Sequence, residues 1–222
     1  MNGKLFASAL LKYCSGVVIV GLLLFLPGGF GFWQGWLLMG ILFIPMFGAG
    51  LVLMAKNPTL LEKRLDAKEQ EAEQRTVVAL SAAVFIATFL AAGLGFRFGF
   101  LVLPKAVSIV AAVLFLGFYG LYAEVLRENT YLSRTVEVQE EQKVIDTGLY
   151  GIVRHPMYMT VVGLFLMMPL VLGSVIGFVL MLAMIPILAK RIRNEEQVLM
   201  DGLPGYRDYM RRVRYRMIPY IW

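Results

Sequence analysis

The sequence predicts an all-α, polytopic integral membrane protein. Of its 222 residues, 59% are hydrophobic and the mean hydropathy is +0.72, whereas soluble chains have roughly 45–50% apolar residues. The charged residues fall in blocks and leave charge-free stretches at residues 13–55, 76–96, 106–123 and 155–189. These stretches are apolar on all sides instead of alternating with period two, which excludes a transmembrane barrel.

Two further classes are excluded by composition. Cys14 is the only cysteine, so the chain is not a disulfide-stapled secreted scaffold. The dominance of apolar residues excludes a disordered chain.

The first two membrane helices share residues 13–55. About 20 residues cross a hydrocarbon core of about 30 Å, so this stretch is long enough for two crossings. Pro27 and the three glycines that closely follow it predict the turn. Trp33 and Trp36 come next and suit a membrane interface because their rings are amphipathic.

The third and fourth helices are predicted at residues 76–96 and about 101–123. Glycine, proline and basic residues mark the connection between them, namely Arg97, Gly99, Pro104 and Lys105. Residues 57–74, between the second and third helices, read as a solvated and partly helical cytoplasmic loop.

The last apolar stretch, residues 155–189, is too long for one crossing. As a single helix its 35 residues would be about 52 Å long. Pro169 and Gly173 fall near its middle and predict a hairpin of two helices, at residues 157–170 and 174–190. The alternative is one tilted helix kinked at Pro169.

Basic residues favour the hairpin, because Lys and Arg are enriched in cytoplasmic loops. The segments before and after the last apolar stretch are both basic, so both should be cytoplasmic. An even number of crossings must then separate them, as the hairpin provides. We therefore expect four transmembrane helices plus a C-terminal membrane hairpin, about six membrane helices in all, with both termini cytoplasmic.

The chemistry is expected in two polar segments that flank the hairpin. In the first, the only histidine of the chain, His155, stands directly before Pro156. A residue before proline favours an extended conformation, whereas proline suits the first position of a helix. His155 should therefore mark the start of the first hairpin helix, whose N-terminus suits an anionic group. The simpler alternative is that Arg-His-Pro only caps this helix.

The second segment contains adjacent glutamates on a helix that leaves the membrane. Arg191 and Glu195 form an i,i+4 pair and Arg193 and Glu196 an i,i+3 pair, so a surface ion-pair face would explain them. Because the hairpin returns, however, both polar segments should meet at one cytoplasmic mouth. Together they would supply cations, an imidazole, two carboxylates and phenols.

A cytoplasmic amphipathic helix is predicted near the C-terminus. Tyr206, Tyr209, Met210 and Val213 follow helical spacing, and arginines occupy the other faces. Such a helix is typical of a membrane interface. With a net charge of +6, it favours anionic lipid headgroups over nucleic acid as the partner. No metal site is expected.

These motifs resemble a known family. Three patterns carry the resemblance: Gly148-x-Tyr150-x-x-x-Arg154-His155-Pro156-x-Tyr158, Arg-x-x-x-Glu195-Glu196-x-x-Leu199, and Gly-Tyr-x-x-Tyr-x-x-x-Val-x-Tyr-x-x-Ile-Pro. Together they resemble the isoprenylcysteine carboxyl methyltransferase family, and the related phospholipid N-methyltransferases share them. The likeness covers about residues 143–222. We accordingly divide the chain into N-terminal transmembrane helices (residues 1–123) and a catalytic, cofactor-binding region (residues 124–222).

The resemblance implies an integral membrane methyltransferase that uses S-adenosylmethionine and takes a lipidic or prenylated acceptor from the bilayer. It implies a cofactor pocket formed by Tyr150, Arg154, His155, Pro156, Glu195, Glu196, Tyr206 and Tyr209. The candidate catalytic residues are Tyr158, Arg191 and Glu196, and the candidate substrate-binding residues are Arg127 and Arg193.

The residues leave the acceptor group open, although the family implies a carboxylate. A carboxylate is already ionised at pH 7 and needs only a cation such as Arg191 to hold it. An amine must lose a proton, which calls for Glu196 or Tyr158 as a base. Two other functions remain as alternatives: an NADPH-dependent sterol or lipid reductase, and a non-enzymatic membrane scaffold.

Overall fold

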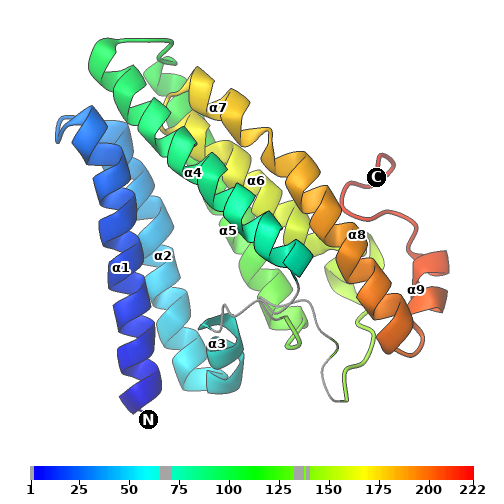
Figure 1. Cartoon of the computed structure of the whole chain (residues 1–222). Coiled ribbons are helices and arrows are strands. Elements are labelled where there is room, and N and C mark those ends of the chain that lie inside the picture. The colour runs from blue at the N-terminus through cyan, green and yellow to red at the C-terminus, as the bar shows by residue number, and fades with distance from the viewer. Residues whose placement is uncertain (1–2, 66–71, 133–137, 139–140) are drawn as a thin grey trace.

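The computed structural model describes residues 3–65, 72–132, 138 and 141–222, and most of these residues are helical (Figure 1). The elements are α1 (Gly3–Gly28), α2 (Trp33–Lys56), α3 (Pro58–Leu65), α4 (Ala72–Phe98), α5 (Lys105–Glu128), the 3-10 helix η1 (Gly148–Gly151), α6 (Pro156–Val171), α7 (Val175–Met181), α8 (Met184–Gly202) and α9 (Tyr206–Arg212). Within the described ranges, five helical segments are long and apolar enough to cross a membrane, the last being α7 and α8 together. The predicted all-helical, multi-pass membrane class is confirmed.

The first two helices form the predicted pair, joined by a turn in which Gly29 has φ +76, a conformation that glycine adopts without steric cost. The first helix is longer than predicted, since α1 begins at Gly3 and includes Lys4 and Lys12. Long basic side chains near a helix end can reach the interface, so a lysine does not mark the limit of the helix. Of the predicted loop at 57–74, residues 58–65 form α3, and residues 66–71 lie outside the described part of the chain.

The fourth helix begins later than predicted, at Lys105 instead of residue 101. The residues before it run alongside the turn between α6 and α7. The Leu103 amide donates to the Gly173 carbonyl at 2.8 Å, and the Val175 amide donates to the Leu101 carbonyl at 3.3 Å. These two bonds join the α4–α5 connection to the tip of the hairpin.

The hairpin is present, so the single kinked helix is wrong. α6 ends at Val171, the chain turns at Gly173 with φ +68, and α7 returns beside α6 (Figure 1). The returning arm is divided between α7 and α8, because Pro186 has no N–H to bond the Leu182 carbonyl one turn earlier. α8 then runs to Gly202, beyond the predicted end at residue 190.

The helices pack around a shared apolar core. α5 lies along α6, while α4 contacts α1 on one side and α7 on the other. Fully buried side chains from these helices and the connecting turns fill the centre, including Leu24, Phe32, Phe115 and Val171. Large apolar side chains stay exposed on the outer helix faces, as a lipid environment requires, among them Leu26, Ile44, Val78 and Val113.

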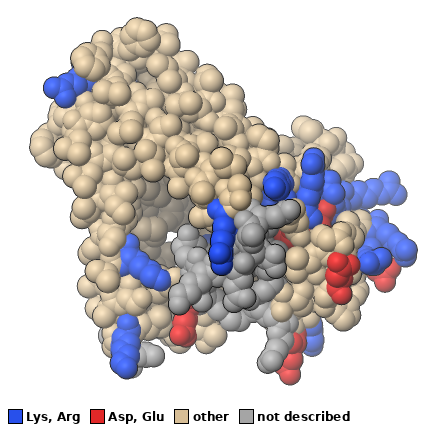
Figure 2. All heavy atoms as spheres, in the orientation of Figure 1, with Lys and Arg blue, Asp and Glu red and all other residues tan. Residues whose placement is uncertain are grey.

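Charged side chains gather at one end of the bundle. Figure 2 shows most of the Lys, Arg, Asp and Glu side chains of this view at the end that holds α3, α9 and the start of α1, whereas the opposite end is nearly free of charge (Figures 1 and 2). Arg97 in the last turn of α4 and Lys105 at the start of α5 flank the α4–α5 connection at that opposite end. The arrangement agrees with an even number of passes between the charged segments. Which side of the membrane each end faces stays a prediction.

Close packing between α1 and α4 depends on Gly93. A Cβ at this position would lie 2.7 Å from Pro27 Cγ and 2.8 Å from the Leu24 carbonyl oxygen. Gly93→Ala should force the helices apart and destabilise the protein by about 2 kcal/mol. The measurement is the thermal unfolding midpoint in detergent. Gly117→Ala on α5 is the matched control, since nothing lies within 4 Å of its added methyl; equal midpoints for both variants would contradict the packing described here.

Candidate functional site

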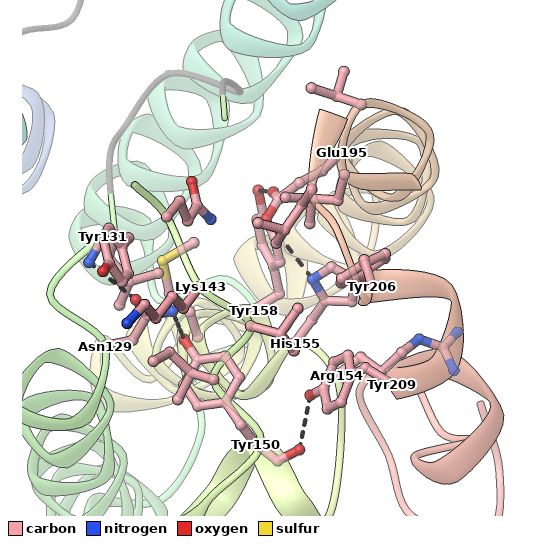
Figure 3. A pocket seen from close by; sticks show the side chains of 18 of the residues that line it. Asn129, Tyr131, Lys143, Tyr150, Arg154, His155, Tyr158, Glu195, Tyr206 and Tyr209 are labelled. Atoms are coloured by element: carbon pink, nitrogen blue, oxygen red, sulfur yellow. Dashed lines mark hydrogen bonds and ion pairs between the residues drawn. The ribbon is translucent and has the colours of Figure 1, made fainter. Parts of the chain in front are cut away.

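A polar pocket lies at the charged end of the bundle, between the α5–α6 connection on one side and α6, α8 and α9 on the other (Figure 3). It occupies about 840 Å³, counted with its opening to solvent. Its lining residues are Asn129, Tyr131, Leu132, Gln142, Lys143, Val144, Ile145, Tyr150, Arg154, His155, Met157, Tyr158, Arg191, Glu195, Val198, Leu199, Leu203, Tyr206 and Tyr209.

His155 lies where the sequence predicts it, at the start of α6. It is the N-cap residue, and Pro156 takes the first helical position. Its backbone, with φ −125 and ψ 61, is outside the helical region but is not fully extended as predicted. The imidazole is buried, yet it lines the pocket. One turn further along α6, Tyr158 presents its phenol to the same space.

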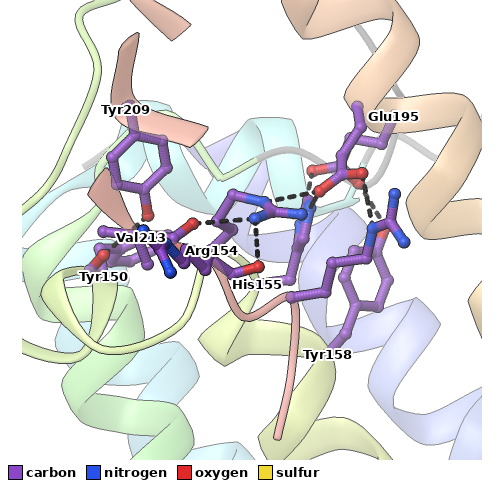
Figure 4. A network of polar contacts seen from close by, with 10 residues as sticks. Tyr150, Arg154, His155, Tyr158, Glu195, Tyr209 and Val213 are labelled. Carbon is purple, nitrogen blue, oxygen red and sulfur yellow. Dashed lines mark hydrogen bonds and ion pairs between the residues drawn. The ribbon is translucent and has the colours of Figure 1, made fainter. Parts of the chain in front are cut away.

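The two polar segments that flank the hairpin meet in this pocket, as predicted. The Tyr158 hydroxyl donates to Glu195 Oε2 at 2.6 Å, and Arg191 Nε donates to the Tyr158 oxygen at 3.0 Å. His155 Nδ1 lies 3.9 Å from Glu195 Oε1. A cation, a phenol, a carboxylate and an imidazole are thus held within one turn of α6 and one turn of α8 (Figure 4).

Glu196 does not line the pocket and is only 2% exposed. Its carboxylate accepts hydrogen bonds from Arg154 Nε and Arg216 Nε, both at 2.7 Å, and lies 3.3 Å from His155 Nε2. A surface ion-pair face therefore does not describe Glu196. Successive residues of an α-helix point about 100° apart, so one glutamate enters the pocket while the next enters the protein behind it.

Arg154 is buried, and its guanidinium donates hydrogen bonds to other groups of the protein (Figure 4). Besides the bond to Glu196, Arg154 Nη1 donates to the Val213 carbonyl at 2.8 Å and to the Arg214 carbonyl at 2.7 Å. These bonds tie the segment before α6 to the chain after α9. Arg154 also lines the pocket, and its role in cofactor binding stays a prediction.

Two tyrosines close the opposite side of the pocket. The Tyr209 hydroxyl donates to the Tyr150 carbonyl at 2.7 Å, and the Tyr150 hydroxyl accepts from the Asn129 amide at 3.0 Å. Burial raises the pKa of both phenols, so each stays protonated at neutral pH and can act as a donor.

The packing of α9 differs from the prediction. Tyr206, Tyr209 and Val213 are buried against Leu203, and Met210 packs on the same cluster. The apolar face therefore covers the pocket, where the sequence predicts contact with a leaflet. The arginines on the other face form exposed ion pairs with aspartates, including Arg207 with Asp201 and Arg211 with Asp208. The anionic lipid partner stays a prediction.

The Tyr206 hydroxyl is a pocket group whose hydrogen-bonding capacity is not satisfied by the described residues. It is buried, and within the described residues it has no hydrogen-bond partner. Burial raises the pKa of Tyr206, and the negative charges of Glu196 and Glu195 raise it further, so the group is a neutral phenol. A buried donor without a partner costs about 1–3 kcal/mol, and Tyr206 lines the pocket, so an acceptor on a bound ligand would satisfy it.

Some predicted site residues lie outside the pocket. Because α5 continues to Glu128, Arg127 sits on its surface, where the guanidinium is 75% exposed and pairs with Glu124 at 2.5 Å. Arg193 is exposed on α8, and Pro156 is buried at the start of α6; neither lines the pocket. The expectation that Arg127 and Arg193 bind substrate is therefore not supported by their positions.

Other pocket residues were missed by the sequence analysis. Asn129, Tyr131, Gln142 and Lys143 come from the connection between α5 and η1, which has neither a periodic pattern nor a motif. Glu128 anchors that connection, because its carboxylate accepts from Thr147 Oγ1 at 2.9 Å and from the Leu149 amide at 3.2 Å. No signal in the sequence separates these residues from an ordinary solvated loop.

The fold and pocket describe a multi-pass helical membrane protein with a polar pocket at its charged end. A comparison with protein families adds to this: residues 107–201 match the model of the isoprenylcysteine carboxyl methyltransferase (ICMT) family. The match runs from α5 through the hairpin and along α8. It confirms the resemblance seen in the motifs: over these residues the chain is similar to the isoprenylcysteine carboxyl methyltransferase family.

The buried carboxylate should be a major source of stability. Glu196→Gln removes the negative charge that faces Arg154 and Arg216, and breaking one side of a buried ion pair costs about 3–5 kcal/mol. We expect a large fall in the midpoint of denaturant unfolding in detergent. Glu195→Gln, one residue earlier, is the matched variant: it keeps an acceptor for Tyr158 and should cost much less. Similar losses for both variants would show that Glu196 has no special role.

Proposed function

We propose that this protein transfers a methyl group from S-adenosylmethionine to the carboxylate of a lipidic or prenylated acceptor. The observation that carries the proposal is the cluster of Tyr158, Arg191 and Glu195, which lines the pocket. All three residues lie within the family-matched segment. The match to a methyltransferase family gives the reaction class. The side chains of the pocket supply the groups that such a reaction needs.

The pocket fits the cofactor chemically. S-adenosylmethionine supplies a methyl group activated on a sulfonium, and it also carries an ammonium, a carboxylate and ribose hydroxyls. The partnerless Tyr206 hydroxyl would donate to an oxygen of this molecule, and Glu195 would attract its positive charge. The N-terminus of α6 at His155 suits its carboxylate.

A carboxylate acceptor needs no general base from the protein, because it is ionised at neutral pH. Arg191 lines the pocket beside Tyr158 and would hold the acceptor by charge-assisted hydrogen bonds. Met157, Val198 and Leu199 give the same pocket an apolar surface for the lipid-bearing part of the acceptor. The main task of these residues is alignment, since a displacement at a methyl group requires the reacting atoms to be in line.

Methyl transfer to a lipid amine is the second candidate. An amine must lose a proton, and the hydrogen bond between Tyr158 and Glu195 could relay it. Glu196, the other candidate base, is enclosed by Arg154, Arg216 and His155 and does not line the pocket. Because an essential base is needed only for the amine, the carboxylate is the simpler fit.

We further propose that the pocket end faces the cytoplasm and that residues 124–222 form the catalytic region. The basic residues that gather at this end support the orientation (Figure 2). All of the lining residues lie between Asn129 and Tyr209, which supports the division of the chain.

Calorimetry with the purified protein tests the cofactor. Wild-type protein should bind S-adenosylmethionine, and Tyr206→Phe should weaken binding about 3–10-fold, the value of one neutral hydrogen bond. Binding of NADPH instead would favour the reductase, and binding of neither would favour a scaffold; both results contradict the proposal.

Arg191→Ala should abolish methyl transfer while leaving the protein folded, because it removes the cation that orients the acceptor. The assay incubates the protein with labelled S-adenosylmethionine and a membrane lipid extract and follows label in the lipid fraction. The matched control is Arg207→Ala on α9, an exposed arginine outside the pocket lining. Near-normal turnover by Arg191→Ala would remove this residue from the mechanism.

The labelled product of the same assay distinguishes the two acceptors. A carboxyl methyl ester should release its label in mild base, whereas a methylated amine should retain it. We expect base-labile label; base-stable label would overturn the carboxylate and favour transfer to nitrogen.

A further inference from the structure

The chain after α9 folds back over the pocket wall. We call residues 213–222 the C-terminal strap. The Arg154 amide donates to the Tyr215 carbonyl at 2.9 Å, and the His155 amide donates to the Arg216 carbonyl at 2.7 Å. With the two bonds from the Arg154 guanidinium, the short segment that begins α6 is held to the strap by both its backbone and a side chain.

The strap is itself fixed to the bundle. Met217 is buried in the cluster that contains Tyr158 and Ile192, and Trp222 packs against the same cluster. The Arg216 guanidinium lies over the Trp222 ring, 5.4 Å from its centroid. The Met217 and Ile218 amides both donate to the Trp222 carbonyl, at 2.9 and 3.0 Å, which closes the strap into a compact loop.

Arg216 connects this strap to the buried carboxylate. The two oxygens of Glu196 are divided between different partners: Oε1 accepts from Arg154 and faces His155 Nε2, while Oε2 accepts from Arg216. Arg216 therefore fixes the rotation of the carboxylate. That rotation in turn keeps Oε1 beside the imidazole of His155, which lines the pocket.

We propose that Arg216 is a positioning residue for the donor pocket, acting through Glu196 on His155. The inference rests on the proposed function, because it assigns Arg216 to the binding of S-adenosylmethionine. Arg216 does not line the pocket, and it lies beyond the family-matched residues 107–201. Its effect on the donor is therefore indirect, through the orientation of the groups that do line the pocket.

Removing the charge of Arg216 should weaken donor binding more than it slows the chemistry. In Arg216→Gln we expect the Kd and KM for S-adenosylmethionine to rise about 10-fold, the effect of losing one hydrogen bond to a charged group, with kcat changed less than about 3-fold. Arg216→Lys keeps the positive charge and should show a rise of about 3-fold. Arg211→Gln removes an exposed arginine of α9 whose ion pair with Asp208 contributes little, and it should bind the donor like the wild type.

Hydrogen exchange measured by mass spectrometry supplies a readout that needs no donor. The amides of Arg154 and His155 are bonded to the strap, so the peptide that contains them should exchange faster in Arg216→Gln and at the wild-type rate in Arg211→Gln. An unchanged exchange rate together with an unchanged donor Kd in Arg216→Gln would overturn the inference.

A purely structural role gives a different pattern. The Gln and Lys variants would then lose thermal stability and donor affinity equally, and that result would also overturn the positioning role. If Arg216→Gln does not fold, Arg216→Lys carries the test alone, and a donor Kd equal to the wild type would contradict the proposal. Wild-type protein that fails to bind S-adenosylmethionine would instead refute the proposed function, while the exchange measurement would still report on the strap.

Discussion

The carboxylate of Glu196 is the interaction on which the site depends. A buried anion is stable only when it is paired and hydrogen-bonded. Glu196 lies on α8, and its partners come from two other parts of the chain: Arg154 and His155 from the segment before α6, and Arg216 from the strap after α9. Each of these parts builds a wall of the pocket or supports one. The cost of leaving the charge unpaired therefore acts as a constraint that brings the three parts to one place.

That constraint works only because the hairpin has a fixed register. The bonds of Leu103 and Leu101 to the α6–α7 turn hold the hairpin tip at the end of the bundle opposite the pocket. With the tip fixed, the lengths of the two arms determine which residue of α8 faces the start of α6. Tyr158 then lies opposite Arg191 and Glu195, and a slip of one residue would turn these side chains by about 100°. The apolar end thus sets the geometry of the polar end.

Much of this architecture follows from the sequence, because apolar stretches, glycine turns and the distribution of basic residues report directly on membrane crossing. The meeting of Arg154–Tyr158 with Arg191–Glu196 could also be predicted, as it needs only a returning hairpin. Which face of a helix turns inward could not. The spacing of Tyr206 and Tyr209 would be the same whether the apolar face of α9 packed on the protein, as it does, or on a leaflet. Arg127 is a residue type that could bind an acceptor, but it lies on the exposed surface of α5. The sequence around Asn129, Tyr131, Gln142 and Lys143 has no periodicity from which the contribution of these residues to the pocket could be predicted.

The adjacent glutamates have separate tasks that follow from their surroundings. Glu196 faces two guanidinium groups, which remain charged at any physiological pH, so its own charge is balanced within the protein. The Glu195 side chain is 24% exposed and accepts a hydrogen bond from the neutral Tyr158 phenol. Because that phenol carries no charge, the negative charge of Glu195 still faces the pocket that this residue lines. Arg191 and Lys143 add positive charge to the same space. A pocket with both signs of charge beside apolar side chains suits a ligand that is itself cationic at one point and anionic at another, together with an anionic, lipid-bearing acceptor. This matching of charge, more than any single residue, supports the proposed pairing of a sulfonium donor with a carboxylate acceptor.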